Sequence, residues 1–132
     1  MSKSLAEIRQ TFIDLLKDHL GQLKITADNE TKFEVTGTIE AMQGKKKVDG
    51  FYFATVVPKP KDVRFYFFPT YTHRDDLIDT FSDEMKKCLK GKSCFHVKSL
   101  SPELEEEFKG LIAKAIKLYQ KDGLLVLSLI HI

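Results

Sequence analysis

The sequence of 132 residues contains no tryptophan, only two cysteines and no long hydrophobic run. A membrane-spanning helix needs about 20 consecutive apolar residues, so we expect no interaction with a membrane. The first ten residues, MSKSLAEIRQ, lack the apolar segment that a secretory signal requires. Two cysteines in a chain without such a signal favour reduced thiols over a disulfide. Together these absences predict a cytoplasmic protein.

The chain also carries little net charge. Its formal charge is only +2 at pH 7, which is too small to indicate nucleic-acid binding, and we expect none. The charge is unevenly distributed, because residues 45–98 hold twelve basic and seven acidic side chains. This basic middle segment is compatible with an anionic ligand, although lysine-rich surfaces more often serve solubility alone.

Hydrophobic periodicity and turn residues divide the chain into helices and strands. Ser4 and Glu7 match a capping box at the start of the first helix, and Ser101-Pro102 matches the start of the last one. Residues 43–50 are expected to form a basic loop between glycines, and PKPK (58–61) a hairpin turn. The predicted elements are a helix over 4–20, strands over 23–27, 32–39, 51–57 and 62–68, a helix over 72–91 with a break before Ser82, a strand over 93–99 and a helix over 102–123.

This order predicts an α+β fold. Consecutive strands with short loops make a two-layer, mostly antiparallel five-stranded sheet, with helices packed on one face. The length and the 42% of hydrophobic residues suit one domain, which we place at residues 1–123. The apolar tail 124–132 is more typical of a strand than of a helix. It is interpreted as an edge strand, a homodimer contact or an extension.

The segment KCLKGKSCFHVK (87–98) contains a Gly-Lys-Ser, two cysteines and a histidine. A phosphate loop is excluded, because the glycine that should precede Gly-Lys-Ser is Lys86 and the predicted helix comes first. A zinc site is disfavoured, because Cys88 and Cys94 do not have ligand spacing and no second pair completes four ligands. The segment is instead interpreted as a helix that ends at Gly91, followed by a strand from Ser93.

Strand alternation predicts two different faces of the sheet. Odd-numbered residues are mostly apolar and should face the helices; they are Leu23, Ile25, Phe33, Val35, Ile39, Phe51, Phe53, Val57, Val63, Phe65, Phe67, Phe95 and Val97. Even-numbered residues should form an open face that mixes aromatic and cationic side chains, with Ala54 and Val56 among them. Exposed aromatic rings beside cations can bind a partner or a flat anion.

We therefore predict a small, non-enzymatic binding protein that takes a small ligand or a protein partner on this open face. No catalytic residue, metal or cofactor is predicted. The candidate ligand-binding residues are Tyr52, Arg64, Tyr66, Phe68, Tyr71, His73, Lys92, Cys94 and His96.

Three motifs resemble a family of small uncharacterised bacterial proteins, the YdhG-like family. They are Phe68-Pro69-Thr70-Tyr71, Gly91-Lys92-Ser93-Cys94-Phe95 and a last helix that ends near Gly123. The resemblance covers roughly residues 5–123 and implies the α+β fold, but it implies no reaction. Some YdhG-like proteins are described as frataxin-like iron carriers, which would imply iron binding by surface carboxylates.

Two alternatives to the binding protein stay open. An iron carrier would use the acids Asp75, Asp76, Asp79, Asp83, Glu84, Glu103, Glu105, Glu106 and Glu107. Acidic residues also favour helix N-termini for electrostatic reasons alone. A thiol-dependent enzyme would use Cys94, with nearby His96 as base and Lys90 and Lys92 lowering the thiol pKa.

Overall fold

The computed structural model describes residues 3–127, which form a six-stranded antiparallel sheet, a separate two-stranded hairpin and several helices. The strands of the large sheet follow the order β1-β2-β5-β6-β8-β7. The elements are α1 (Leu5–Lys17), β1 (Leu23–Asp28), β2 (Phe33–Gly37), β3 (Ala41–Gln43), β4 (Lys46–Val48), β5 (Tyr52–Pro58), β6 (Val63–Phe67), α2 (Pro69–Thr72), α3 (Arg74–Leu77), the 3-10 helix η1 (Ile78–Thr80), α4 (Asp83–Cys88), β7 (Leu89–Lys90), β8 (Cys94–Val97) and α5 (Pro102–Lys121).

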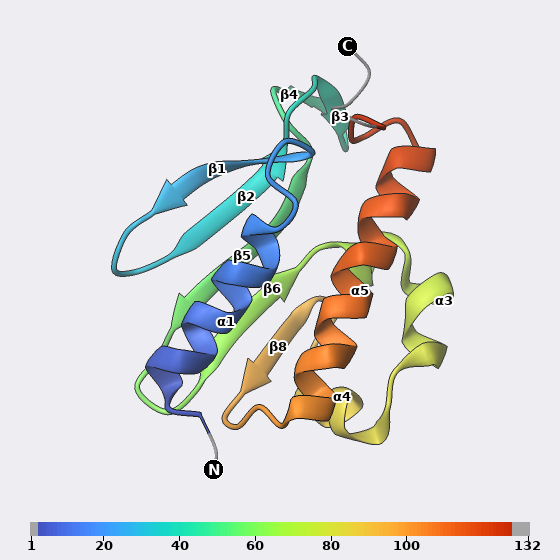
Figure 1. Ribbon diagram of the computed structural model, residues 1–132. Helices are drawn as coiled ribbons and strands as arrows, with labels where there is room; N and C mark the ends of the chain where they lie inside the picture. The colour runs from blue at the N-terminus through green and yellow to red at the C-terminus, as the bar shows by residue number, and fades with distance from the viewer. Residues whose placement is uncertain (1–2, 128–132) are drawn as a thin grey trace.

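The helices α1 and α5 lie side by side across one face of the sheet, and α3 and α4 lie beside α5 (Figure 1). Among residues 3–127, no helix covers the opposite face (Figure 1). The predicted α+β class and its two layers are therefore confirmed, although the sheet has six strands where five were expected. None of the helices within residues 3–127 is both long and apolar enough to cross a lipid bilayer.

Both long helices begin as the sequence predicts. The Ser4 side chain accepts a hydrogen bond from the Glu7 amide, and the Glu7 carboxylate accepts one from the Ser4 amide. Ser101 caps α5 in the same way through the Leu104 amide, with Pro102 at the first helical position. A side-chain cap of this kind contributes about 1 kcal/mol to helix stability.

Phenylalanine fills the layer between the sheet and the helices. The Phe12 ring of α1 stacks on the Phe65 ring of β6 at 4.6 Å between centroids. The Phe108 ring of α5 meets the Phe95 ring of β8 edge-on at 5.1 Å, and all four side chains are fully buried. Burying one such ring contributes about 1.5–3 kcal/mol, so this layer dominates the stability of the fold.

Two segments differ from the sequence prediction. The loop expected over 43–50 belongs partly to the β3–β4 hairpin, in which Met42 pairs with Lys47. The helix expected over 72–91 begins earlier, at Pro69, and is divided into α2, α3, η1 and α4. It does restart after Ser82, as predicted, because the Ser82 side chain accepts a hydrogen bond from the Met85 amide.

The segment 87–98 is a β-hairpin, which corrects the role assigned to Gly91. The helix α4 ends at Cys88, and β7 follows at once and pairs with β8 through Lys90 opposite Cys94. Gly91 lies in the turn between these strands with φ +75°, a conformation that favours glycine. It is therefore a hairpin residue and not the end of a helix.

A β-bulge at Phe53 reverses the predicted alternation in β5. Thr36 of β2 lies opposite Tyr52, whereas the preceding Val35 lies opposite Ala54, so Phe53 is an extra residue. From Ala54 onward the even-numbered residues face the helices, and Ala54 and Val56 are fully buried. The prediction that they lie on the open face is wrong. Conversely, Val57 pairs with Arg64 and lies on the open face.

The beginning of the apolar tail belongs to the core. Leu125 is only 2% exposed and joins the buried cluster, so the compact unit continues beyond Gly123. Its side chain packs over Gly37, where an added Cβ would lie 2.8 Å from Leu125 Cδ2. Residues 124–127 form no strand, and residues 128–132, where the strand prediction continues, lie outside the described part of the chain.

Candidate functional site

The strand register places five of the nine predicted site residues together on the open face. Arg64 of β6 lies opposite His96 of β8, and Tyr66 lies opposite Cys94, so these four side chains form two adjacent cross-strand pairs. Thr55 of β5 lies opposite Tyr66 and hydrogen-bonds the Tyr52 hydroxyl. Tyr52, Arg64, Tyr66, Cys94 and His96 therefore share one surface, as predicted.

One end of this surface is organised by Asp62, which the sequence analysis did not select. Its carboxylate lies 3.3 Å from Arg64 Nε and 3.8 Å from His96 Nδ1. Asp62 is only 6% exposed, although it directly follows the turn between β5 and β6. The signal that could have identified it is its position two residues before Arg64 in the alternation. The Arg64 guanidinium at this end is thus partly balanced by a buried carboxylate.

The centre of the open face is a shielded polar network. Glu34 Oε2 accepts a hydrogen bond from Thr26 at 3.0 Å, and Glu34 Oε1 accepts one from Thr55 at 3.3 Å. Burial raises the pKa of Tyr52 to about 12. Burial also raises the pKa of the Cys94 thiol, although its hydrogen bond to Tyr66 acts in the opposite direction.

The other end is an aromatic corner, defined here as Tyr52, Phe68, Tyr71 and Lys92. The Phe68 ring lies 5.5 Å from the Tyr52 ring and stacks on the Tyr71 ring at 5.6 Å. Lys92 Nζ lies 5.6 Å from the centre of the Tyr71 ring, within the range of a cation–π contact. Tyr71 is 51% exposed, so part of its ring remains free to contact a ligand.

A hollow of about 410 Å³ opens beside the aromatic corner and is lined by Tyr71, Arg74, Gly91 and Lys92. The corner is held at the end of β6 by backbone contacts. Phe67 donates a hydrogen bond to the Ser93 carbonyl at 2.7 Å, which joins β6 to the β7–β8 turn. The Thr70 hydroxyl donates to the Phe67 carbonyl at 2.7 Å and fixes the start of α2.

His73 does not belong to this site, which corrects its selection from the sequence. Its Nε2 lies 2.7 Å from Asp122 Oδ2, and its Nδ1 lies 3.2 Å from Asp76 Oδ2. The imidazole ring also lies 5.6 Å from the Tyr119 ring of α5. His73 therefore links α3 to the end of α5 on the helical side of the molecule. The reason is that α2 starts at Pro69 and carries the chain away from the sheet.

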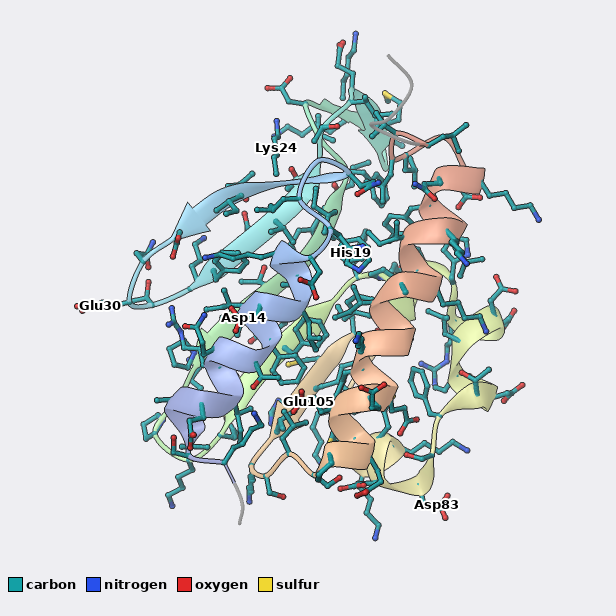
Figure 2. All side chains as sticks on the ribbon, in the orientation of Figure 1. Asp14, His19, Lys24, Glu30, Asp83 and Glu105 are labelled. Carbon is teal, nitrogen blue, oxygen red and sulfur yellow. The ribbon has the colours of Figure 1, made fainter. Side chains whose placement is uncertain are left out.

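The carboxylates selected for iron binding do not converge. Glu107 accepts hydrogen bonds from Ser82, whereas Glu84 accepts one from Ser101 at 3.2 Å. Glu105 lies 3.5 Å from Lys3 Nζ. Asp83 and Glu105 point away from one another in Figure 2. Within residues 3–127, no group of three or more His, Cys, Asp or Glu side chains is arranged to hold a metal ion.

Comparisons of this chain with protein-family models, with curated proteins and with solved structures find no match. The resemblance to the YdhG-like family therefore stays a prediction. The function of the chain is therefore inferred from the site geometry alone.

Proposed function

We propose that this protein is a non-enzymatic, cytoplasmic binding protein that takes a small, flat anion at the aromatic corner. Such a ligand is an aromatic ring that carries a carboxylate or a similar acid. The observation that supports the proposal is the half-exposed Tyr71 ring, which is stacked on Phe68 and accompanied by Lys92 beside a hollow.

The position of the Tyr71 ring supports an aromatic ligand. An exposed tyrosine normally samples several rotamers, and immobilising it on binding costs free energy. Here the ring already rests on Phe68, which in turn contacts Phe51 at 5.7 Å between centroids. A preorganised ring with an exposed edge is suited to stacking on a second ring.

The positive charges around the hollow support a negatively charged ligand. Lys92 and Arg74 line the hollow, and within residues 3–127 neither has a carboxylate within 4.0 Å. Two cations without a counter-ion at the mouth of one hollow attract a negative group. An aromatic acid would satisfy both the ring and the cations at once.

The thiol-enzyme alternative receives no support from the geometry of Cys94. A nucleophilic cysteine needs a lowered thiol pKa, whereas burial raises the pKa of Cys94. The iron-carrier alternative requires converging carboxylates, and the selected acids bind separate partners. Neither observation favours these functions over ligand binding.

The proposal can be tested with indole-3-acetate as an aromatic acid and acetate as its ring-free counterpart. We expect indole-3-acetate to shift the backbone amide resonances of Tyr71, Arg74 and Lys92, and acetate at equal concentration to leave them in place. Replacing Tyr71 by alanine should weaken binding about fivefold, corresponding to about 1 kcal/mol of lost aromatic and cation–π contact.

The matched control is Lys24→Gln, because Lys24 is an exposed lysine on β1 (Figure 2), the edge strand on the opposite side of the sheet from the β7–β8 turn that carries Lys92. Lys92→Gln should weaken binding of indole-3-acetate, whereas Lys24→Gln should not. Equal loss in both variants would show that net charge alone attracts the acid. Native mass spectrometry of protein taken from cells adds a second test, and a bound protein instead of a small molecule would contradict the proposal.

A further inference from the structure

A hollow lies beside β8 and extends to the opposite end of this strand from the aromatic corner. It has a volume of about 460 Å³ and is lined by Asp62, Glu84, Lys87, Cys88, Lys90, His96, Lys98, Ser99 and Leu104. Its walls come from α4, β7, β8 and the segment after it, the residue before β6 and the first turn of α5. In Figure 1, α4 and the start of α5 lie at the lower end of the sheet. A hollow of this size accommodates a small metabolite.

Three lysines give this hollow its chemistry, and we call it the lysine pocket. Lys87, Lys90 and Lys98 come from three different segments and are exposed. No carboxylate lies within 4.0 Å of any of them in the described part of the chain. Three ammonium groups around one hollow repel each other, and a bound anion removes that repulsion.

The two acids of the lysine pocket are already engaged by other groups. Asp62 lies against Arg64 and His96, and Glu84 accepts a hydrogen bond from the Ser101 hydroxyl at the start of α5. They therefore do not neutralise the three lysines through direct contacts. A second hollow of about 260 Å³ shares Asp62 and adds Lys59, Lys61 and Arg64 to the same end of the molecule.

From this arrangement we propose that the lysine pocket binds the phosphate group of a small, hydroxyl-bearing molecule, such as a sugar phosphate. A phosphomonoester has three terminal oxygens and nearly two negative charges, so it can accept hydrogen bonds from three ammonium groups at once. A carboxylate has only two oxygens and one charge. Phosphate therefore matches the three lysines better than a carboxylate does.

The remaining groups of the pocket fit the rest of such a ligand. The carboxylates of Asp62 and Glu84 have acceptor capacity beyond their present contacts, and sugar hydroxyls are donors that can use it. Leu104 and Cys88 supply the apolar part of the wall. A phosphate and a polyol thus find cations and acceptors in the same hollow.

The experiment measures binding of ribose 5-phosphate to the full chain by isothermal titration calorimetry at physiological salt. The test variant is Lys87→Gln/Lys90→Gln/Lys98→Gln. The matched control is Lys45→Gln/Lys46→Gln/Lys109→Gln, three exposed lysines of the β3–β4 hairpin and α5 that do not line the pocket. Both variants lose three positive charges, and glutamine keeps the polar side chain in each.

We expect the pocket variant to bind ribose 5-phosphate at least tenfold more weakly, and the control variant to bind it within about twofold of the native protein. Equal weakening in both variants would overturn the proposal, because net charge alone would then explain binding. Absence of binding to the native protein would also overturn it. Ribose without phosphate should not bind, and inorganic phosphate that binds as tightly as ribose 5-phosphate would overturn the assignment to a hydroxyl-bearing ligand.

This site is independent of the aromatic corner. The two hollows share no lining residue, although Lys90 of the lysine pocket directly precedes Gly91 of the corner; the lysine pocket extends from there to Lys98 and Ser99, beyond the other end of β8. Tyr71→Ala should therefore leave ribose 5-phosphate binding unchanged. The triple lysine variant should likewise leave the amide shifts caused by indole-3-acetate in place, so the two proposals fail or succeed separately.

Discussion

The two faces of the large sheet are built from the same strands but differ in how deeply their side chains are buried. On the helix-covered face, side chains such as Phe65 and Phe95 are fully buried and belong to the hydrophobic core. On the open face, their neighbours Tyr66 and Cys94 are half-buried and lie among polar groups. From this contrast we expect most of the stability to come from the covered layer, and the proposed binding to use the open face and the ends of its strands.

The strongest test of this contrast compares two adjacent residues of β6. Phe65→Ala should lower the free energy of unfolding by about 3–5 kcal/mol, because it leaves a cavity beneath Phe12 and Phe108. Tyr66→Ala, one residue later on the open face, should cost less than about 2 kcal/mol, because water can fill the space. Urea unfolding followed by circular dichroism measures both values.

The slope of the urea transition is the control, because it must stay constant if both variants unfold from the same compact state. Equal costs for the two substitutions would contradict the assignment of stability to the covered face.

The centre of the open face gives the next test, because Tyr52 is more shielded than an open surface implies. Burial raises the pKa of Tyr52 to about 12, so the hydroxyl should stay protonated in the folded protein when an unfolded tyrosine, with a pKa near 10, has ionised. Its contribution to stability is complete below pH 10 and is lost as the pH rises from 10 to 12. The loss should reach about 2 kcal/mol.

Tyr52→Phe has no hydroxyl to ionise and isolates this effect. The difference in unfolding free energy between the native protein and Tyr52→Phe should be constant at neutral pH and change in favour of the variant above pH 10. If the difference in unfolding free energy stayed constant up to pH 12, the Tyr52 hydroxyl would be exposed to solvent. The centre of the open face would then be as accessible to water as its edges.

A smaller effect on stability is expected at Asp62, the largely buried carboxylate at one end of the open face. Asp62→Asn keeps the shape of the side chain but removes the charge between Arg64 and His96. We expect the free energy of unfolding to fall by about 1–2 kcal/mol, because the Arg64 guanidinium loses the charge of its largely buried carboxylate partner. Thermal unfolding of both proteins in the same buffer measures the change.

The surface pair Lys47–Glu40 is the matched comparison, since its atoms lie 3.0 Å apart but both side chains are mostly exposed. Glu40→Gln should cost less than about 0.5 kcal/mol, as is typical of solvated ion pairs. If Asp62→Asn costs no more than Glu40→Gln, the Asp62 cluster does not stabilise the fold.

Much of the covered face could be predicted from the sequence, because its signals are local. The capping box at Ser4, the Ser101-Pro102 helix start and the alternation in β6 and β8 each follow from residues a few positions apart. The reversal at Phe53 could not be predicted in this way. It arises because Thr36 and Val35 pair with β5 across a bulge, which depends on a partner strand far along the chain.

The candidate site was predicted only in part for the same reason. Tyr66 and Cys94 were placed on one surface correctly, since both strands keep their alternation. His73 was misplaced because the chain turns at Pro69 and packs against α5, a contact between residues 49 positions apart at Asp122. The strand β7 was missed because Leu89 and Lys90 continue the apolar and basic pattern of the preceding helix. Tertiary pairing, and not local propensity, decides these positions.

The smallest expected effect concerns the covering layer itself. Gly110 lies inside α5, and a Cβ added there meets no atom within 4 Å. Because glycine loses more backbone entropy than alanine when a helix forms, Gly110→Ala should raise the free energy of unfolding by about 0.5–1 kcal/mol. Gly50→Ala is the opposite control, since its added Cβ would lie 2.0 Å from the Gly37 carbonyl oxygen and must displace the backbone. If the covered layer provides stability and the open face provides binding, Gly110→Ala should raise the melting temperature and leave the affinity for both probe ligands unchanged.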